Sequence, residues 1–183
     1  MTLFEYDSAV RNDAPILCGV DEAGRGPLAG DVYAAAVIFD ENVSIGGLND
    51  SKKLSEKKRE TLFDEITKKA TAYCVAAATV EEIESLNILQ ATMLAMKRAV
   101  EGLGIVPDMA IIDGNSLPNL VCPAKTVVKG DGLSACIAAA SVLAKVSRDR
   151  YMKKLAEEYP QYQFEKHKGY GTKLHNEMIL KYG

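Results

Sequence analysis

The sequence has 183 residues, 48% of them apolar and 26% charged, which is typical of a globular chain that can bury a sizeable core as one domain. No apolar run approaches the roughly 20 residues that span a bilayer, and the N-terminal stretch lacks the apolar segment of a signal peptide, so we expect a cytoplasmic protein without a membrane partner. The net charge of −3 hides an uneven distribution of charge. Residues 1–50 hold 9 acidic and 2 basic side chains, whereas residues 145–175 hold 8 basic and 4 acidic ones. Because a charged partner responds to such local fields, the net charge does not exclude a nucleic-acid partner.

Apolar runs and helical spacing alternate along the chain. Short apolar runs predict strands, and apolar residues that recur every three or four positions predict helices. In chain order the pattern predicts strands at 16–20 and 33–39, a helix capped by Ser55 and reaching Ala70, a strand at 71–79, a helix at 86–103, strands at 109–112 and 126–128, and helices at 133–159 and 173–181. Strands that first follow one another and then alternate with helices indicate a mixed sheet with helices on both faces, an α/β three-layer fold formed by one domain over residues 1–183.

Two adjacent carboxylates, Asp21 and Glu22, end the first predicted strand, and the triplet Gly24-Arg25-Gly26 follows them. Residues 24–29 match the glycine fingerprint of dinucleotide-binding turns. They lead into a second predicted strand, however, instead of the helix that such a turn must open, and the carboxylates would repel a pyrophosphate. The remaining structural alternative is a pair of solvated residues at a strand end, with Arg25 as their ion partner.

Two further carboxylates follow strands that read as buried, Asp113 in I-I-D-G-N and Asp131 in V-K-G-D-G. Ligand sites of such sheets lie at the carboxyl ends of parallel strands, so all four carboxylates are predicted to converge there. Their repulsion would cost several kcal/mol without a cation. Mg²⁺ prefers oxygen ligands, and two such ions can promote phosphodiester hydrolysis. The four cysteines form no C-x-x-C pair, which disfavours zinc.

The adjacency of Asp21 and Glu22 poses a geometric problem. Neighbouring residues on a regular strand point to opposite faces of the sheet, so these two side chains can share a metal only if the strand distorts. We therefore expect the strand to distort, with a bend or bulge immediately after Asp21 and Glu22, where Gly24 and Gly26 permit it.

Six motifs occur in the order of one known family. They are D21-E-A-G-R-G-P-L-A-G30, L48-N-D-S-K-K-L54, I112-D-G-N115, K129-G-D131, I137-A-A-A-S-V-L-A-K-V-S-R-D149 and H167-K-G-Y-G-T-K-L-H175. Together they resemble ribonuclease HII from about residue 16 to 180. The resemblance implies a ribonuclease H-like fold with a central five-stranded mixed sheet. It also implies an endonuclease that hydrolyses the RNA strand of RNA/DNA hybrids and incises 5′ to single ribonucleotides in duplex DNA, by two-metal-ion hydrolysis that leaves 3′-hydroxyl and 5′-phosphate ends.

The resemblance also assigns roles to individual residues. It places four residues at the catalytic positions that bind Mg²⁺ or Mn²⁺: Asp21, Glu22, Asp113 and Asp131. It identifies Gly24, Arg25 and Gly26 as the loop that senses the ribonucleotide, and glycine does permit the backbone to approach a 2′-hydroxyl closely. It identifies Tyr170 as the aromatic residue at the RNA/DNA junction, where the bare sequence would favour a partly buried loop residue. Ser51 and Lys52, with Lys53, match a segment near the substrate backbone, although such a run is more often a solvated helix face.

A wider phosphate-binding surface is predicted from Lys145, Arg148, Lys166 and Lys168, with residues 160–183 forming a C-terminal loop and helix that help bind substrate. A monomer is expected. Sequences of this family usually continue past K-Y-G, whereas this one stops at Gly183, so docking to a sliding clamp is doubtful. Two other hypotheses stay open, a non-catalytic nucleic-acid binding module and a DNA-directed nuclease of the same fold. The four carboxylates oppose the first, and the glycine triplet with Tyr170 opposes the second.

Overall fold

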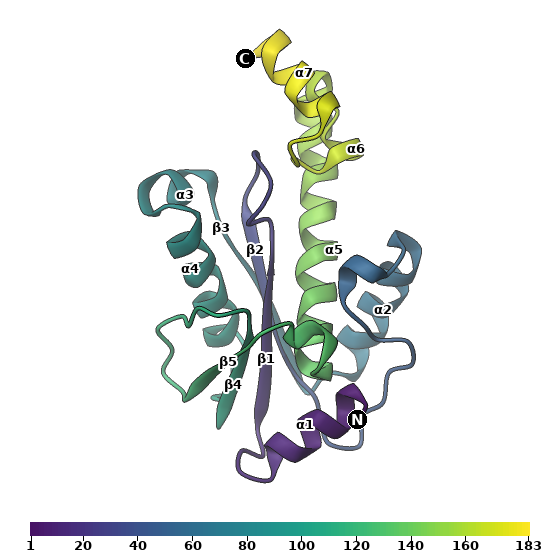
Figure 1. The fold of residues 1–183 in the computed structure, drawn as a ribbon, viewed down its shortest axis with the longest axis vertical. Coiled ribbons are helices and arrows are strands. Elements are labelled where there is room, and N and C mark those ends of the chain that lie inside the picture. Colours follow the sequence, from purple (N-terminus) through teal and green to yellow (C-terminus); the bar gives the residue numbers. More distant parts are fainter.

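The computed structural model describes residues 1–183 and centres on one five-stranded sheet (Figure 1). Its strands are β1 (Leu17–Ala23), β2 (Val32–Ile38), β3 (Ala72–Ala78), β4 (Met109–Asp113) and β5 (Ala124–Val127). Their order across the sheet is β3-β2-β1-β4-β5. β1, β2 and β3 pair antiparallel, whereas β4 runs parallel to both β1 and β5. The predicted mixed sheet is confirmed, and no predicted strand end differs from the observed one by more than three residues.

Helices cover both faces of this sheet (Figure 1). One face carries α1 (Leu3–Arg11), α2 (Glu56–Lys69) and α5 (Ala135–Glu158), and the other carries α3 (Val80–Leu86) and α4 (Ile88–Glu101). Beyond α5 the chain forms two further helices, α6 (Phe164–His167) and α7 (Lys173–Tyr182). Three short 3-10 helices lie elsewhere along the chain: η1 (Ser51–Lys53) before α2, η2 (Gly130–Gly132) before α5 and η3 (Pro160–Tyr162) after α5. The three-layer α/β architecture is therefore confirmed. None of the helices combines the length and the apolar character needed to cross a membrane.

The long helix α5 lies directly on β1 because small residues meet at their contact. A Cβ atom added to Gly19 of β1 would lie 2.2 Å from the carbonyl carbon of Cys136 in α5, so only glycine fits there. On the helix side the run Ala138–Ala140 is fully buried. The first turn of α5 is capped by Ser134, whose hydroxyl accepts the N–H of Ile137, and by Asp7 of α1, which accepts the N–H of Cys136 at 2.9 Å. This packing fixes α5 relative to the strand that carries Asp21.

Two helices, α1 and α3, were not predicted from the apolar pattern, and both begin with a polar capping motif. In both α1 and α3 a threonine and a glutamate three residues later form a capping box, Thr2 with Glu5 and Thr79 with Glu82. Neither helix has a fully buried apolar side chain, although Leu3, Phe4, Tyr6 and Val10 of α1 and Ile83 of α3 pack against the core while partly exposed. The predicted helix at 86–103 corresponds to α4. Its first residue is set by Asn87, which has a φ of +74° and separates α3 from α4.

Candidate active site

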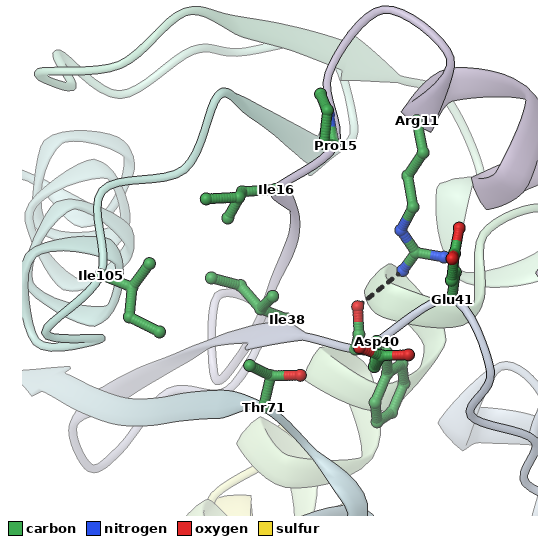
Figure 2. A pocket seen from close by; sticks show the side chains of 9 residues that line it. Arg11, Pro15, Ile16, Ile38, Asp40, Glu41, Thr71 and Ile105 are labelled. Atoms are coloured by element: carbon green, nitrogen blue, oxygen red, sulfur yellow. Dashed lines mark hydrogen bonds between the residues drawn. The ribbon is translucent and has the colours of Figure 1, made fainter.

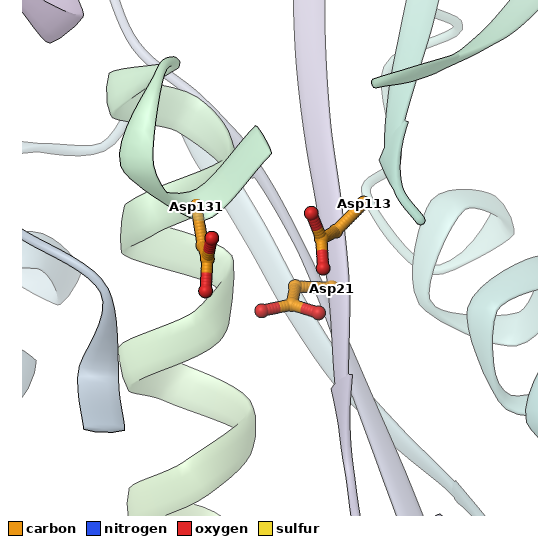
Figure 3. Close-up of side chains that lie close together, drawn as sticks. All are labelled: Asp21, Asp113 and Asp131. Carbon is orange, nitrogen blue, oxygen red and sulfur yellow. The ribbon is translucent and has the colours of Figure 1, made fainter. Parts of the chain in front are cut away.

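Three of the four predicted carboxylates meet on one face of the sheet (Figure 3). Side chains alternate along a strand, so Asp21 shares a face with Gly19, two residues earlier, which contacts α5. Asp113 likewise shares a face with Ile111, which packs with Ile137 of α5. Asp131 lies in η2, in the turn just before α5 begins. One oxygen from each of Asp21, Asp113 and Asp131 lies within 4.8 Å of the other two.

The environment of these carboxylates disfavours their negative charge. Burial raises the pKa of Asp21 well above its usual value, and the charges of Glu22 and Asp113 raise it further. Burial and the charge of Asp113 likewise raise the pKa of Asp131. No ion pair within 4.0 Å joins any of the three to a lysine or arginine. A crowded set of buried and partly buried carboxylates without a close cation has the donor chemistry of a hard divalent-cation site.

Backbone donors fix the orientation of two of these carboxylates. The N–H of Glu22 donates to Oδ1 of Asp21 at 2.7 Å, and the N–H of Gly130 donates to Oδ1 of Asp113 at 2.6 Å. The second contact links the end of β4 to η2, where Asp131 lies. The acidic cluster is therefore held in place by the sheet and by the turn that leads into α5.

The first strand is not distorted at the two carboxylates themselves, but the bend expected immediately after them is present. The register of β1 with β2 is unbroken from Cys18↔Ile38 to Ala23↔Tyr33, so there is no bulge at Asp21 and Glu22. The backbone bends only afterwards, at Gly24, whose φ is +107°. Pairing with β4 ends at Val20↔Ile112, which leaves one edge of β1 unpaired beside the two acidic residues.

Glu22 consequently lies at the margin of the cluster. Strand alternation starts its side chain on the face opposite to Asp21, and it is not among the three residues whose oxygens meet within 4.8 Å. Burial raises its pKa, and the charge of Asp113 raises it further, whereas Arg25 and Lys52 lower it. The carboxylate of Glu22 is thus within electrostatic reach of the cluster, and its role as a metal ligand stays a prediction.

Most of the predicted substrate-binding residues line one cavity of about 270 Å³ beside Asp21. Its lining residues are Asp21, Glu22, Ala23, Gly24, Arg25, Gly26, Ser51, Lys52, Ser141, Lys145 and Tyr170. Asp113 and Asp131 line an adjoining cavity of about 600 Å³ together with Asp50, Lys53 and Lys129. Lys52 borders both cavities. Burial opposes its charge, but nearby carboxylates, Asp21 and Asp131 foremost, outweigh that effect and raise its pKa.

The glycine triplet and Tyr170 are close neighbours in this cavity. A Cβ atom added to Gly26 would lie 3.8 Å from Cε1 of the Tyr170 ring. Tyr170 as a whole residue is 41% exposed, and Nζ of Lys145 lies 5.6 Å from the centroid of its ring. His175 donates from Nδ1 to the carbonyl of Tyr170 at 3.0 Å, which fixes the backbone of this loop. The two segments are 144 positions apart in sequence and meet only in the folded chain.

Two predicted contact residues are buried. The hydroxyl of Ser51 lies 2.9 Å from that of Ser141 in α5, so it connects η1 to α5 and does not face solvent. The expectation that Arg148 belongs to a phosphate-binding surface is wrong, because its side chain is 1% exposed and donates only to backbone carbonyls. Lys145, Lys166 and Lys168 keep partial or full exposure.

One residue of this site was not predicted, Ser141. Hydrogen bonding by Ser141 lowers the pKa of Asp21 and so partly offsets the effect of burial. The signal for it is present in the sequence, because Ser141, Lys145 and Arg148 recur at spacings of four and three residues within an otherwise small, apolar helix. That spacing places them on one helix face.

Another cavity, of about 420 Å³, lies at the opposite end of the sheet (Figure 2). It is bordered by Ile16 before β1, Ile38 at the end of β2 and Thr71 before β3. Its arginine, Arg11, donates to the carbonyl of Phe39 at 3.0 Å. Chemically reactive groups do not converge there as they do around Asp21, so we place the candidate active site at the acidic cluster.

Comparison with known proteins agrees with this geometry. The family model described as ribonuclease HII matches residues 18–183. Ribonuclease HII from Idiomarina loihiensis is 59% identical over 168 residues, which cover 92% of this chain and 90% of the relative. The enzyme of the same name from a Marinomonas species is 62% identical over 169 residues, covering 92% of this chain and 85% of that one.

Solved structures agree as well. Ribonuclease H2 from Pyrococcus horikoshii superposes with a TM-score of 0.74 at 28% identity, covering 90% of this chain and 85% of that one. The ribonuclease HII in a PCNA complex from Archaeoglobus fulgidus gives a TM-score of 0.71 at 25% identity, over 91% of this chain and 87% of that one. Matches of this length and identity show that the chain belongs to the ribonuclease HII family, metal-dependent endonucleases that cleave the RNA of RNA/DNA hybrids.

Proposed function

We propose that this chain hydrolyses the RNA strand of RNA/DNA hybrids and also cuts duplex DNA on the 5′ side of single embedded ribonucleotides, leaving 3′-hydroxyl and 5′-phosphate ends. The observation that carries the proposal is the composition of one cavity, in which the Gly24–Gly26 backbone and the Tyr170 ring lie beside the carboxylate of Asp21. An enzyme that acts at one 2′-hydroxyl needs groups that read the sugar within reach of the groups that promote hydrolysis.

The acidic residues are proposed to hold Mg²⁺ or Mn²⁺ in a two-ion site, with Asp21, Asp113 and Asp131 at its centre and Glu22 at its margin. The supporting observation is the mutual approach within 4.8 Å of one oxygen from each of three carboxylates, those of Asp21 and Asp131 buried and that of Asp113 partly buried. When bound, such ions supply charge stabilisation at the attacked phosphate and the leaving oxygen. The chain itself keeps the carboxylates oriented, through the N–H groups of Glu22 and Gly130.

The glycine triplet and Tyr170 are proposed to select the nucleotide. The backbone at Gly24–Gly26 is free of side chains except for that of Arg25, so its amides and carbonyls can approach a 2′-hydroxyl. The Tyr170 ring is proposed to stack on the deoxyribose that follows the ribonucleotide, where a second 2′-hydroxyl would clash. The residue is 41% exposed and lines the cavity beside Asp21, which supports that contact.

Lys52 is proposed to contact the phosphate at the point of cleavage, because it borders both cavities and keeps its positive charge beside the carboxylates. Ser51 supports that position from within, through its contact with Ser141. We further propose that residues 1–183 act as one domain and as a monomer. Residues 160–183 take part in substrate binding through the loop that carries Tyr170.

A cleavage assay with four labelled duplexes tests the proposal. The substrates are a DNA duplex with one ribonucleotide, a long RNA/DNA hybrid, an all-DNA duplex and an all-RNA duplex, each with and without Mg²⁺ or Mn²⁺. We expect metal-dependent incision of the first two only, with a product end 5′ to the ribonucleotide. Binding without incision would support a non-catalytic binding module, and equal cutting of all-DNA would support a DNA-directed nuclease; either result refutes the proposal.

A further inference from the structure

Arg148 of α5 is a buried arginine without a carboxylate partner. Its side chain is 1% exposed, and the ion pairs of the chain do not include it. Its guanidinium donates instead to three backbone carbonyls: Nε to Asp31 at 3.0 Å, Nη1 to Lys168 at 2.9 Å and Nη2 to Ala29 at 2.9 Å. Burying a charge without a counter-ion is unfavourable, and three carbonyls arranged around one planar fork only partly offset that cost.

The three carbonyls belong to two segments that are far apart in sequence. Ala29 and Asp31 end the loop that starts at Gly24, and Lys168 comes just before the Gly169-Tyr170 turn. Between the two segments, the N–H of Leu28 donates to the carbonyl of Gly169 at 2.8 Å. Arg148 therefore joins the glycine loop and the tyrosine loop to the same helix.

The fit around the guanidinium is tight on both sides. A Cβ atom added to Gly24 would lie 2.3 Å from Nε of Arg148, so the Gly24 backbone rests against the guanidinium group. A Cβ atom added to Gly169 would lie 2.5 Å from the carbonyl oxygen of Ala29. Each loop thus has a glycine where the two loops and Arg148 come together, and a shift of the arginine must move both.

We propose that Arg148 is a positioning residue that sets the distance between the Gly24–Gly26 backbone and the Tyr170 ring, and thereby the selectivity for a single ribonucleotide followed by DNA. This inference rests on the proposed function, in which these two elements read adjacent sugars. Lysine cannot replace arginine in this role, since a single ammonium group cannot reach three carbonyls that lie in different directions. Arg148 itself lies behind the loops and does not contact the substrate.

The test compares Arg148→Lys and Arg148→Gln with the same two substitutions at Arg150. Arg150 lies two positions further along α5, is exposed and pairs with Glu60 on α2, so its variants control for the loss of an arginine from this helix. Measured quantities are kcat and KM on the single-ribonucleotide duplex and on a long RNA/DNA hybrid. We expect the ratio of kcat/KM for the first substrate to that for the second to fall at least about 10-fold in the Arg148 variants, because small displacements of positioning groups have effects of this order. The Arg150 variants should keep the wild-type ratio.

A second measurement does not depend on activity. Trypsin can cut after Arg25 and after Lys168, one site in each loop that Arg148 holds. Under native conditions we expect both cuts to be at least about 10-fold faster in the Arg148 variants than in the wild type, since loosened loops are preferred sites of cleavage. The increase in melting temperature on adding Mn²⁺ should stay at its wild-type value, because the acidic cluster does not contact Arg148.

The outcomes separate this inference from the proposed function. If the wild type does not cut at a single ribonucleotide, the proposed function fails, whereas the tryptic rates still decide whether Arg148 holds the two loops. An unchanged substrate ratio together with unchanged tryptic rates overturns the inference. So does loss of the Mn²⁺-induced shift, which would place the effect of Arg148 on the acidic cluster. If both Arg148 variants lose the fold by circular dichroism, Arg148 serves general stability and the inference is likewise overturned.

Discussion

Replacing Asp21 by asparagine should stabilise the metal-free protein while abolishing turnover. Asp21 is 5% exposed, and its oxygen lies within 4.8 Å of oxygens from both Asp113 and Asp131. At an effective dielectric constant of about 20, two full charges at that separation repel each other by about 3.5 kcal/mol. Asparagine keeps the shape of the side chain and an oxygen that can accept the N–H of Glu22, so the substitution removes charge and little else.

The net gain in the free energy of unfolding must be smaller than this Coulomb repulsion energy. Lys52 already offsets part of the repulsion, and raised pKa values let the cluster share protons. We expect a gain of about 1–2 kcal/mol in the free energy of unfolding, which is within the range of substitutions that relieve a functional site. For a chain of this size that gain corresponds to an increase in melting temperature of about 2–8 °C.

Metal should reverse the order of stability. A ligand at 100 times its Kd stabilises the folded state by about 2.7 kcal/mol, and the wild type should gain this from Mg²⁺ or Mn²⁺ while Asp21→Asn gains much less. Thermal unfolding is measured with EDTA and with a metal titration, alongside hybrid cleavage and binding. Asp64→Asn, an exposed substitution on α2, controls for the change in net charge. The reasoning is refuted if metal-free Asp21→Asn is less stable than the wild type, or if metal stabilises both proteins equally.

Three further predictions concern Tyr170, Gly19 and His167. Tyr170→Ala should lower kcat/KM on the single-ribonucleotide duplex about 10-fold more than on a long hybrid. The control Tyr73→Ala, at a similarly exposed tyrosine of β3, should change kcat/KM on neither substrate. Equal losses on both substrates would make Tyr170 merely structural. Gly19→Ala should cost at least about 3 kcal/mol in urea unfolding, because the new Cβ meets the backbone of α5 at 2.2 Å, and a cost below about 1 kcal/mol would contradict that packing. Burial lowers the pKa of His167 below its ordinary value of 6.5, so the unfolded chain takes up a proton first and stability should fall as the pH drops below about 6.5. Urea unfolding of His167→Gln between pH 5 and 7.5 should show a weaker fall than the wild type, and identical pH profiles would exclude this contribution.

The sheet and the convergence of acidic residues are predictable from the sequence because each depends on local pattern. Short apolar runs mark the five strands, and Asp113 and Asp131 follow such runs directly. Strand alternation then assigns Asp21 and Asp113 to the face that α5 covers. What local pattern does not reveal is where a strand ends. The apolar run stops at Val20, but pairing with β2 continues to Ala23, so Asp21 and Glu22 lie inside a regular strand instead of at its distorted end.

The position of Arg148 shows the other limit of sequence reasoning. In the run S-R-D-R on the polar part of a long helix, an arginine reads as solvent-exposed, and helical spacing alone supports that interpretation. Its burial results from two loops that close over the helix through backbone carbonyls, which lie 117 and 119 positions before Arg148 in one loop and 20 positions after it in the other. Backbone carbonyls are present at every residue, so no side-chain pattern marks the contact in advance.

Helix α5 connects the chemistry of the site to its proposed selectivity. Hydrogen bonding by Ser141 lowers the pKa of Asp21, Nζ of Lys145 lies 5.6 Å from the centroid of the Tyr170 ring, and Arg148 donates to carbonyls of the glycine loop and of the tyrosine loop. Ser141 and Arg148 are seven positions apart, a rise of about 10 Å along one rigid helix. The opposite face of the same helix, at Ala139, Leu143 and Val146, lies in the core. Substitutions on the polar face should therefore change which substrate is cut, and those on the opposite apolar face should change stability first, because only the polar face touches the groups that we propose to meet the nucleic acid.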